Sequence, residues 1–312
     1  MDRLHELEVF VAVADAGGLA RAGARLRISP PAVTRAVASL EARLGARLFN
    51  RTTRRVSLTE AGARFLAHTR RLLGELGDAE REALGEDAEP AGRLSVTASA
   101  TFGRATLAPI VRAFLAQQPR VTASLLLLDR VVDLVEEGID VAVRIGQLPD
   151  SSLVARRVGE VRRVLVASPR YLARHGRPAA PAELKRHALI AFTGLMPTRE
   201  WRFGEGRSAV HVGVAPRLEV NDASAAIAAA EAGEGITIAL SYMVAAAVAG
   251  GRLATLLDGF MPPPAPVQLV YPHARLMAPK LRAFVDFAAP RLSAELAKVA
   301  ATRPPARRAG RR

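Results

Sequence analysis

Residues 29 to 54 hold hydroxyl and guanidinium side chains at spacings that suit the reading of double-stranded DNA. Ser29 is a good N-cap residue, because its hydroxyl can accept an otherwise unpaired backbone N–H. Pro30 suits the first position of the helix that follows, where its missing N–H costs nothing. Arg35, further along, can donate two hydrogen bonds to the edge of a guanine. The pattern therefore predicts a recognition helix that lies in the major groove.

The predicted recognition helix has two unlike faces. At about 100° per residue, apolar side chains recur along one side: Val33, Val37, Leu40 and Leu44. The opposite side carries Pro31, Arg35, Ala38 and Ala42, with Thr34 and Ser39 at its borders. Small residues allow close approach to base pairs, and a threonine methyl can touch thymine. An ordinary amphipathic helix with a solvated polar face would give the same pattern, so the helix alone leaves both interpretations open.

The segments on either side of this helix favour the DNA-binding interpretation. Upstream, apolar side chains recur along one side of a helix, enough to complete a small three-helix core: Leu4, Leu7, Phe10, Val11 and Ala14. Downstream, Asn50–Arg55 is a basic, hydroxyl-rich loop between apolar residues. Such a loop suits a wing whose arginines and hydroxyls hold phosphates or enter the minor groove. A helix-turn-helix requires this layout, since one helix braces the helix that reads the groove.

With these segments, the chain resembles the LysR-type transcriptional regulators. The resemblance is carried by an ordered set of motifs: Leu4–Ala14, Ser29–Arg35, Leu40–Gly45, Leu48–Arg51 and Leu58–Gly62. It extends through a second domain to about residue 295. One position departs from the family pattern. Gly18-Leu19-Ala20 stands where members often carry Ser-Phe-Ser or Ser-Phe-Thr, which leaves glycine as a weaker cap for the short helix before the turn.

The resemblance implies an N-terminal all-α winged helix-turn-helix, a long dimerising linker helix, and a two-lobed α/β effector domain like that of periplasmic binding proteins. Pattern and resemblance together predict these DNA contacts: Ser29, Pro30, Pro31, Thr34, Arg35, Ser39, Arg51, Thr52 and Arg54. The implied partners are operator DNA, a small-molecule effector, and further copies of the chain in a homodimer or homotetramer. We expect the DNA-binding domain at 1–59, the linker and hinge at 60–90, the effector domain at 91–302 and a tail at 303–312.

The linker segment has the pattern of a long amphipathic helix. Thr59 can cap it, and no proline interrupts it before Pro90. Apolar residues recur close to heptad spacing: Phe65, Leu72, Leu76, Ala79 and Ala83, with Leu66 and Leu73 beside them. A helix between domains has little core of its own to cover, so the stripe favours a partner helix from a second copy. Packing on the chain's own DNA-binding domain is the alternative. The acidic segment 85–92 indicates a hinge.

From residue 91 on, short strand and helix patterns alternate, which predicts largely parallel sheets with helical crossovers. The expected strands are 94–98, 122–128, 139–145, 163–167, 189–192, 218–220, 236–240 and 267–271. The expected helices are 104–117, 131–137, 224–232 and 276–296. Because the pattern restarts near residue 163, we expect lobe I at about 91–162 and 268–302, and lobe II at about 163–267. Trp201 and Phe203 are expected in the core of lobe II.

A ligand between two such lobes lies at the carboxyl ends of strands. Ser99–Gly103 stands between a strand end and a helix start, where hydroxyls and N–H groups suit the polar or anionic end of a small molecule. The resemblance places three further segments around the cleft. The predicted effector-binding residues are Ser99, Ala100, Thr101, Phe102, Arg144, Gly146, Thr193 and Asp222. Loop and capping chemistry would explain the same residues, and Asp222 in particular can cap the helix that follows it.

The sequence contains no pattern that supports catalysis or metal binding. The six histidines show neither His-x-x-His nor His-x-x-x-His spacing, and the chain lacks a nucleophile elbow and a phosphate-loop motif. Zero cysteines exclude disulfides and thiolate sites. The net charge of +14 favours a polyanionic partner such as DNA. We therefore expect a regulator without enzymatic activity, cofactor or metal.

The main alternative is a solute-binding protein of transport with the same two-lobed fold. No export signal precedes the first helix, and the apolar runs Ala223–Ala230 and Val244–Ala249 are too short to cross a bilayer. We therefore expect a cytoplasmic protein without a membrane partner. The composition of the arginine-rich tail from Arg303 onward predicts disorder. Such a tail either adds a weak, non-specific attraction to DNA or has no role.

Overall fold

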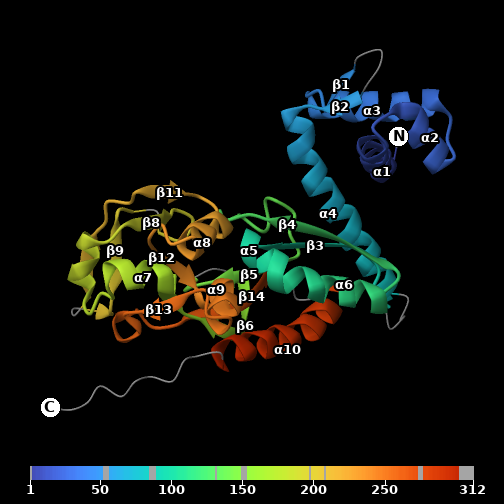
Figure 1. The fold of residues 1–312 in the computed structure, drawn as a ribbon. Helices are drawn as coiled ribbons and strands as arrows, with labels where there is room; N and C mark the ends of the chain where they lie inside the picture. Colours follow the sequence, from blue (N-terminus) through green and yellow to red (C-terminus); the bar gives the residue numbers. More distant parts are fainter. Residues whose placement is uncertain are drawn as a thin grey trace.

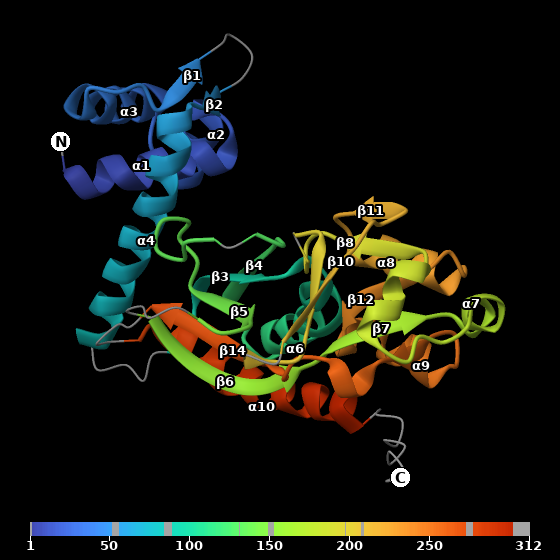
Figure 2. The same cartoon turned by 90° about the vertical axis from the view of Figure 1, so that its left-hand side faces the viewer.

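The chain folds into three consecutive parts, which a computed structural model describes for residues 2–51, 56–83, 89–130, 132–148, 153–196, 198–206, 209–272 and 277–301. A small helical module is followed by one long helix, α4 (Glu60–Ala83), and then by two five-stranded sheets with helices around them (Figure 1). A view turned by 90° shows the N-terminal module and the sheets at opposite ends of α4 (Figure 2).

The N-terminal module contains three helices and a two-stranded hairpin. Its elements are α1 (Arg3–Ala16), α2 (Leu19–Leu26), α3 (Pro30–Leu44), β1 (Phe49–Arg51) and β2 (Val56–Leu58). The two strands pair antiparallel, with Phe49 opposite Leu58. The predicted winged helix-turn-helix is confirmed, and its wing is a short hairpin, so the module is not purely helical.

Apolar side chains of α1, α3 and the wing meet in the core of this module. Phe10 is fully buried, and its ring centroid lies 5.2 Å from that of Phe49 and 5.4 Å from that of Phe65 in α4. Three residues of the predicted apolar face of α3 are also fully buried: Val33, Val37 and Leu40. Leu44, predicted to extend that face, is 39% exposed. The helix ends there, because Gly45 takes the left-handed conformation at φ 64°.

The first turn of α4 is fixed to the wing. The Thr59 hydroxyl accepts the Gly62 N–H at 2.9 Å and donates to the Arg47 carbonyl at 2.7 Å, so the predicted cap is confirmed. Gly62 packs under the Leu48 carbonyl so closely that a Cβ would lie 2.0 Å from that oxygen. The wing and the start of α4 therefore form one unit.

The apolar stripe of α4 is divided between two environments. Phe65 and Leu66 pack into the core of the N-terminal module. Further along, Leu72 and Leu76 are 50% and 36% exposed. The side chains of Ala79 and Ala83 lie outside the described part of the structure. Packing on the chain's own module therefore accounts for the beginning of the stripe and leaves two leucines uncovered.

Lobe I, as we call the first sheet with its helices, has the strand order β4-β3-β5-β14-β6. Its strands are β3 (Gly92–Ala98), β4 (Val121–Leu127), β5 (Val141–Ile145), β6 (Leu153–Val161) and β14 (Ala265–Pro272). Its helices are α5 (Ala100–Phe102), the π-helical turn η1 (Gly103–Leu107), α6 (Ala108–Gln117) and α10 (Pro279–Ala301). Phe114 of α6 and Phe284 of α10 pack edge to face in its core, with ring centroids 5.2 Å apart.

Lobe II has the strand order β11-β8-β12-β7-β13. Its strands are β7 (Arg163–Ala167), β8 (Leu189–Phe192), β11 (Leu218–Val220), β12 (Ile236–Leu240) and β13 (Ala254–Leu256). Its helices are α7 (Pro169–His175), η2 (Pro181–Arg186), α8 (Ala223–Glu231), α9 (Ser241–Ala249) and η4 (Asp258–Phe260). A hairpin of β9 (Glu200–Phe203) and β10 (Val210–Gly213) covers the sheet. Trp201 and Phe203 are each 1% exposed, which confirms that they belong to this core.

Two expectations about the lobes are wrong. The described strands form mixed sheets, because the chain enters lobe II through β7 and returns to lobe I through β14, and both strands run antiparallel to their neighbours. The helix expected at 131–137 is absent from 132–137, where the chain forms turns. There the Asp133 carboxylate accepts the N–H groups of Val135 and Glu136 at 2.8 and 2.9 Å. Aspartate thereby satisfies the backbone locally and favours a turn.

A tyrosine and two histidines form a polar cluster in lobe II. The Tyr171 hydroxyl accepts the Ala188 N–H at 2.9 Å and lies 3.2 Å from His187 Nδ1. The Tyr171 ring stacks on His175 with a centroid distance of 4.4 Å. Burial lowers the pKa of His187, the charge of His175 lowers it further, and Glu183 opposes both. The folded protein therefore favours the neutral form of His187.

We expect the unfolding temperature to fall in acid partly because of His187. A base whose folded pKa is depressed stabilises the fold above its unfolded pKa of about 6.5, and this contribution is lost as the pH falls through the folded pKa. Between about pH 8 and about pH 5, the unfolding temperature of His187→Gln should fall less than that of the wild type. His5→Gln is the control, because the His5 side chain is 42% exposed. Parallel curves for wild type and His187→Gln would contradict the prediction.

Candidate DNA-binding and effector-binding sites

The outward face of α3 presents the predicted recognition residues to solvent. Ser29, Pro30, Pro31 and Arg35 are exposed. Arg35 makes no hydrogen bond or ion pair with any described residue. Ser29 occupies the N-cap position, but its hydroxyl makes no capping hydrogen bond, contrary to expectation. The half-buried Thr34 donates to the Pro30 carbonyl at 3.0 Å. The helix thus offers an unpaired guanidinium on a surface of small side chains.

Ser39 differs from the other predicted contacts. Its hydroxyl donates to Glu6 Oε1 of α1 at 2.6 Å, so it is directed toward the helical core and not toward the outward face. Arg43, one turn further along α3, contacts the other oxygen of the same carboxylate. The sequence pattern placed Ser39 at the border of the polar face and gave no signal for its partner in α1.

The wing is held against the end of α3 by a glutamate. Glu41 Oε1 accepts the backbone N–H groups of Leu48 and Phe49 at 2.8 and 3.1 Å. Arg51 is the last residue of β1, and its side chain is outside the described part of the structure. Thr52 and Arg54 lie outside the described residues as well. The described part of the hairpin ends where Arg51 is paired with Val56.

The predicted effector segment joins β3 to the first helix of lobe I. Ser99 is the N-cap of α5, but its side chain makes no capping hydrogen bond. The Ala100 N–H donates to the Asp129 carboxylate at 3.0 Å, so one of the expected free amides already has an anionic partner. Thr101 is half-buried and Phe102 is fully buried. The π-helical turn follows directly, and such turns are frequent at functional sites.

Tyr242 of lobe II meets this segment, and the sequence reasoning missed it. Its ring packs edge to face on Phe102, with centroids 5.2 Å apart. Its hydroxyl is buried and has no hydrogen-bond partner within the described residues. Burial raises the pKa of Tyr242, an interaction with the Ser99 side chain lowers it, and Asp129 raises it. Tyr242 follows the carboxyl end of β12, so the strand-end rule that selected Ser99 could also have selected it.

Asp222 and Thr193 lie together at the carboxyl ends of neighbouring strands in lobe II. The Thr193 N–H and hydroxyl both donate to the Val220 carbonyl, at 2.9 and 3.3 Å. Asp222 caps α8 by accepting the Ala225 N–H at 2.8 Å, which is the capping role the sequence left open. Its second oxygen lies 3.8 Å from Arg104 Nη2 in lobe I. This ion pair spans the two lobes beside the Ser99–Phe102 segment.

Arg144 and Gly146 are held by backbone groups within lobe I. Arg144 Nη2 donates to the Val132 carbonyl at 2.9 Å, and burial lowers the pKa of its guanidinium. Gly146 has a φ of 118°, and its carbonyl accepts Gln268 Nε2 at 3.2 Å. Neither residue contacts Ser99, Tyr242 or Asp222 in the interactions described. The described interactions place Asp222 and Thr193 beside the Ser99–Phe102 segment, whereas Arg144 and Gly146 interact only with other groups of lobe I.

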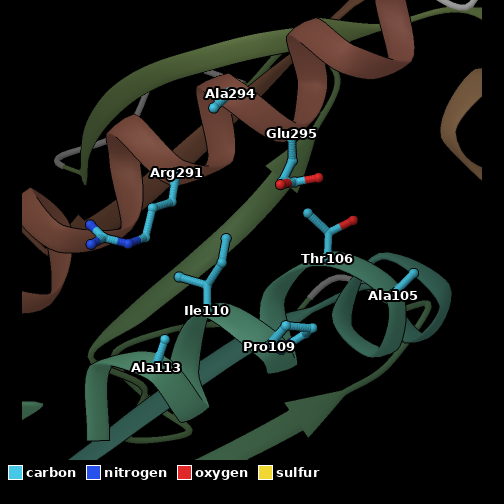
Figure 3. Close-up of a pocket in the computed structure, with 8 residues that line it drawn as sticks. All are labelled: Ala105, Thr106, Pro109, Ile110, Ala113, Arg291, Ala294 and Glu295. Carbon is cyan, nitrogen blue, oxygen red and sulfur yellow. The ribbon is translucent and has the colours of Figure 1, made fainter. Parts of the chain in front are cut away.

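A separate pocket of about 360 Å³ lies between α6 and α10 (Figure 3). It is lined by Ala105, Thr106, Pro109, Ile110, Ala113, Arg291, Ala294 and Glu295. None of the predicted effector residues belongs to it. Its charged groups already have partners, because Lys298 donates to Glu295 at 2.7 Å and the Arg291 guanidinium lies 3.5 Å from the Phe287 ring centroid. The interactions between the lobes are therefore the stronger basis for an effector site.

Comparison with known proteins identifies the family. Residues 4–63 match the bacterial regulatory helix-turn-helix protein, lysR family, and residues 87–293 match the LysR substrate binding domain. The chain belongs to the LysR-type transcriptional regulators. An HTH-type transcriptional regulator of Xanthomonas campestris pv. campestris is 36% identical over 295 residues, covering 93% of this chain and 86% of the relative. The regulator PtxR of Pseudomonas aeruginosa is 36% identical over 283 residues, covering 91% of each chain.

Solved structures of LysR-type regulators share the whole arrangement. CrgA of Neisseria meningitidis aligns with a TM-score of 0.59 and 33% identity, covering 94% of this chain and 99% of CrgA. The virulence activator AphB of Vibrio cholerae aligns with a TM-score of 0.60 and 29% identity, covering 92% and 99%. The LysR-type chain is thus a DNA-binding transcriptional regulator with an effector-binding domain, and the transport alternative is not supported. In the described part of the chain, every helix is too short or too polar to cross a membrane.

Proposed function

We propose that this regulator reads its operator through the exposed face of α3. Arg35 contacts base edges, and Ser29, Pro30, Pro31 and Thr34 surround that contact. The supporting observation is the exposed Arg35 guanidinium, which has no partner among the described residues and stands among small side chains. A bidentate arginine–guanine contact is the commonest specific contact in the major groove. The regulator acts in the cytoplasm, where its operator is accessible.

We propose further that the wing holds DNA phosphates through Arg51, Thr52 and Arg54. Replacing Arg51 or Arg54 by alanine should weaken binding to operator and random DNA alike. It should also reduce the slope of log K against log salt by about 0.9, because one phosphate contact fewer releases one counterion fewer. Fluorescence anisotropy across a salt series measures both effects. Arg157→Ala is the control, since Arg157 is an exposed arginine of lobe I. A wild-type slope in either wing variant would remove that arginine from the phosphate contacts.

The protein acts as a homodimer or homotetramer in this proposal, assembled through α4. The support is the exposure of Leu72 and Leu76 in the middle of a helix whose beginning is packed. Exposure of leucine side chains to water is unfavourable, and burying them stabilises the protein. At this spacing the two leucines can pack against a second amphipathic helix. Because α4 follows directly from the wing, a dimer through α4 would fix the spacing of the two α3 helices on DNA.

The effector, a small molecule, binds between the lobes in this proposal. The observation that carries this placement is the buried Tyr242 hydroxyl, which has no hydrogen-bond partner among the described residues. A ligand there would receive hydrogen bonds from Ser99 and Thr101 of lobe I and from Tyr242 of lobe II. The Ala100 N–H already donates to the Asp129 carboxylate, and that carboxylate would repel an anion. The polar end of the ligand therefore binds the hydroxyls of Ser99, Thr101 and Tyr242 and not the Ala100 amide.

Identification of the bound DNA tests this function. The purified regulator is mixed with fragmented genomic DNA, and the retained fragments are sequenced. We expect a small set of enriched sites that share one motif. Compounds made or consumed by the products of neighbouring genes are then tested as effectors by calorimetry and gel shift. Retention of DNA without any shared motif would contradict sequence-specific recognition by α3.

A further inference from the structure

Glu6 is a buried carboxylate at the contact between α1 and the recognition helix. Its residue is 2% exposed, although glutamate is rarely buried without a partner. Oε1 accepts the Ser39 hydroxyl at 2.6 Å. Oε2 accepts Arg43 Nε at 3.2 Å and Nη2 at 2.7 Å. The hydrogen bonds from Ser39 and Arg43 lower the pKa of Glu6, so the carboxylate is charged at neutral pH. Both oxygens are thus committed to α3.

Three polar residues of α3 form one row along the helix. Arg35, Ser39 and Arg43 follow at intervals of four, so each is rotated by about 40° from the one before. Arg35 projects outward and is exposed. Ser39 and Arg43 turn progressively toward α1, where Glu6 binds them. The row therefore leads from the DNA-facing surface to the interface with α1.

Glu6 and Arg43, the two charged partners, differ in how far solvent can reach them. Glu6 is enclosed by the packed helices α1 and α3, whereas the Arg43 side chain is 36% exposed and can swing into solvent. A charge buried without a partner is strongly unfavourable. Loss of Arg43 would therefore leave a buried charge unpaired, while neutralisation of Glu6 would release an arginine at the edge of the DNA-facing surface.

We propose that Glu6 is a positioning residue for DNA recognition: it fixes the rotation of α3 through Ser39 and withholds Arg43 from the DNA phosphates. Arg35 then projects from the row while Arg43 stays bound to Glu6. The affinity for the operator increases, because α3 meets the groove in one orientation. Non-specific binding is restrained, because Arg43 does not add a phosphate contact on DNA of any sequence.

The test measures affinity and its salt dependence for the full-length protein on two duplexes. One is the duplex that wild-type protein selects from a randomised pool, and the other has a random sequence. Glu6→Gln keeps an oxygen for Ser39 but removes the charge that holds Arg43. We expect the slope of log K against log salt to steepen by about 0.9 on both duplexes, since one released arginine gains one phosphate. We expect the affinity for both duplexes to rise together and their ratio to stay near the wild-type value, because the amide oxygen still accepts the Ser39 hydroxyl and a phosphate contact does not depend on sequence.

Two further variants separate charge release from loss of orientation. In Glu6→Gln/Arg43→Gln, the salt slope should return to the wild-type value, because no cation is released. In Ser39→Ala, which alters no charge, the slope should be unchanged while the affinity ratio falls. This variant also decides the positioning role if Glu6→Gln proves too unstable to assay, as judged by thermal unfolding. The wild-type ratio in folded Ser39→Ala would then overturn the proposal.

Each remaining outcome has a defined meaning. An unchanged slope in Glu6→Gln shows that Arg43 is not withheld from DNA and overturns the proposal. A slope reduced by about 0.9 shows that Glu6 presents Arg43 to a phosphate, which is the opposite role. The inference rests on the proposed DNA-facing surface of α3, and Arg35→Ala tests that surface separately. An Arg35→Ala variant with wild-type operator affinity would refute the surface even if the Glu6 variants behave as expected.

Discussion

Arg35→Ala should weaken operator binding by about 1–3 kcal/mol, which raises the Kd about 5- to 150-fold. Arg35 is exposed at the centre of the outward face of α3 and has no partner among the described residues. Alanine favours the helix, so the substitution should leave the fold intact. The loss should be largest on the operator, because a base contact contributes only where its guanine is present.

Titrations of Arg35→Ala on operator and random duplexes at one salt concentration measure this effect. A base reader loses affinity for the operator and little for random DNA. Equal losses on both duplexes would identify Arg35 as a phosphate contact. Arg112→Ala is a suitable control, because Arg112 is an exposed arginine on α6, a helix of lobe I that Figure 1 shows away from the N-terminal module. The unfolding temperature of each variant confirms that the comparison concerns folded protein.

The winged helix-turn-helix could be predicted from sequence because its signals are local. Helical periodicity from Val33 to Leu40, a proline at the first turn of α3 and a threonine before α4 each act within one element. The failures in this module concern contacts between elements. The position of Ser39 at the border of the polar face predicts a DNA contact, but packing against α1 brings Glu6 Oε1 within 2.6 Å of its hydroxyl. Helical spacing predicts Leu44 in the core, but the helix ends at that residue and its side chain is exposed.

In the effector domain, the alternating patterns predict eight of the strands but not β6, β9, β10 or β13, and they do not predict strand direction. β7 and β14 have the same apolar runs as parallel strands, so nothing in their composition shows that they run antiparallel. Their direction follows from the path of the chain between lobes. Residues 132–137 carry apolar side chains at a spacing that suits a helix, but Asp133 binds the backbone two and three residues ahead and closes a turn.

Part of the candidate effector site could be predicted from sequence, because some of its signals are local. Ser99 and Asp222 follow strand ends in one continuous segment each, so a rule on strand ends finds them. Tyr242 also follows a strand end, but an aromatic residue at a helix start reads as core packing. Its significance comes from a contact across the lobes, the 5.2 Å packing on Phe102, together with a buried hydroxyl that has no hydrogen-bond partner among the described residues. Sequence periodicity carries no information about such a contact.

Removing both hydroxyls in Ser99→Ala/Thr101→Ala should abolish the response to effector while preserving dimerisation and basal DNA binding. These hydroxyls would hold the polar end of the ligand on lobe I, and Tyr242 would hold it on lobe II. Each lost hydrogen bond leaves a polar group of the ligand unpaired in the site, which costs about 1–3 kcal/mol. Two such losses, about 2–6 kcal/mol together, raise the effector Kd by about 30-fold or more.

The response itself depends on a difference between two arrangements of the protein. A ligand shifts an equilibrium only by its differential affinity for the two states. The pair of Arg104 and Asp222 spans the lobes at 3.8 Å, and Tyr242 packs across the same boundary. A ligand that rearranges these contacts would change how the lobes sit, and in the proposed assembly α4 would transmit that change to the α3 helices. Without the hydroxyls the ligand makes no such distinction, so DNA binding stays at its basal level.

Calorimetry with the effector, beside footprints of the operator with and without it, tests this prediction. Tyr242→Phe is the matched variant from lobe II. It removes a hydroxyl without a hydrogen-bond partner among the described residues, so the effector-free protein should keep its unfolding temperature while effector binding weakens. Ser99→Ala/Thr101→Ala protein that binds effector with wild-type affinity would place the site elsewhere. If that protein instead fails to bind the operator without effector, these residues support the fold, and the site between the lobes must be assigned to other groups.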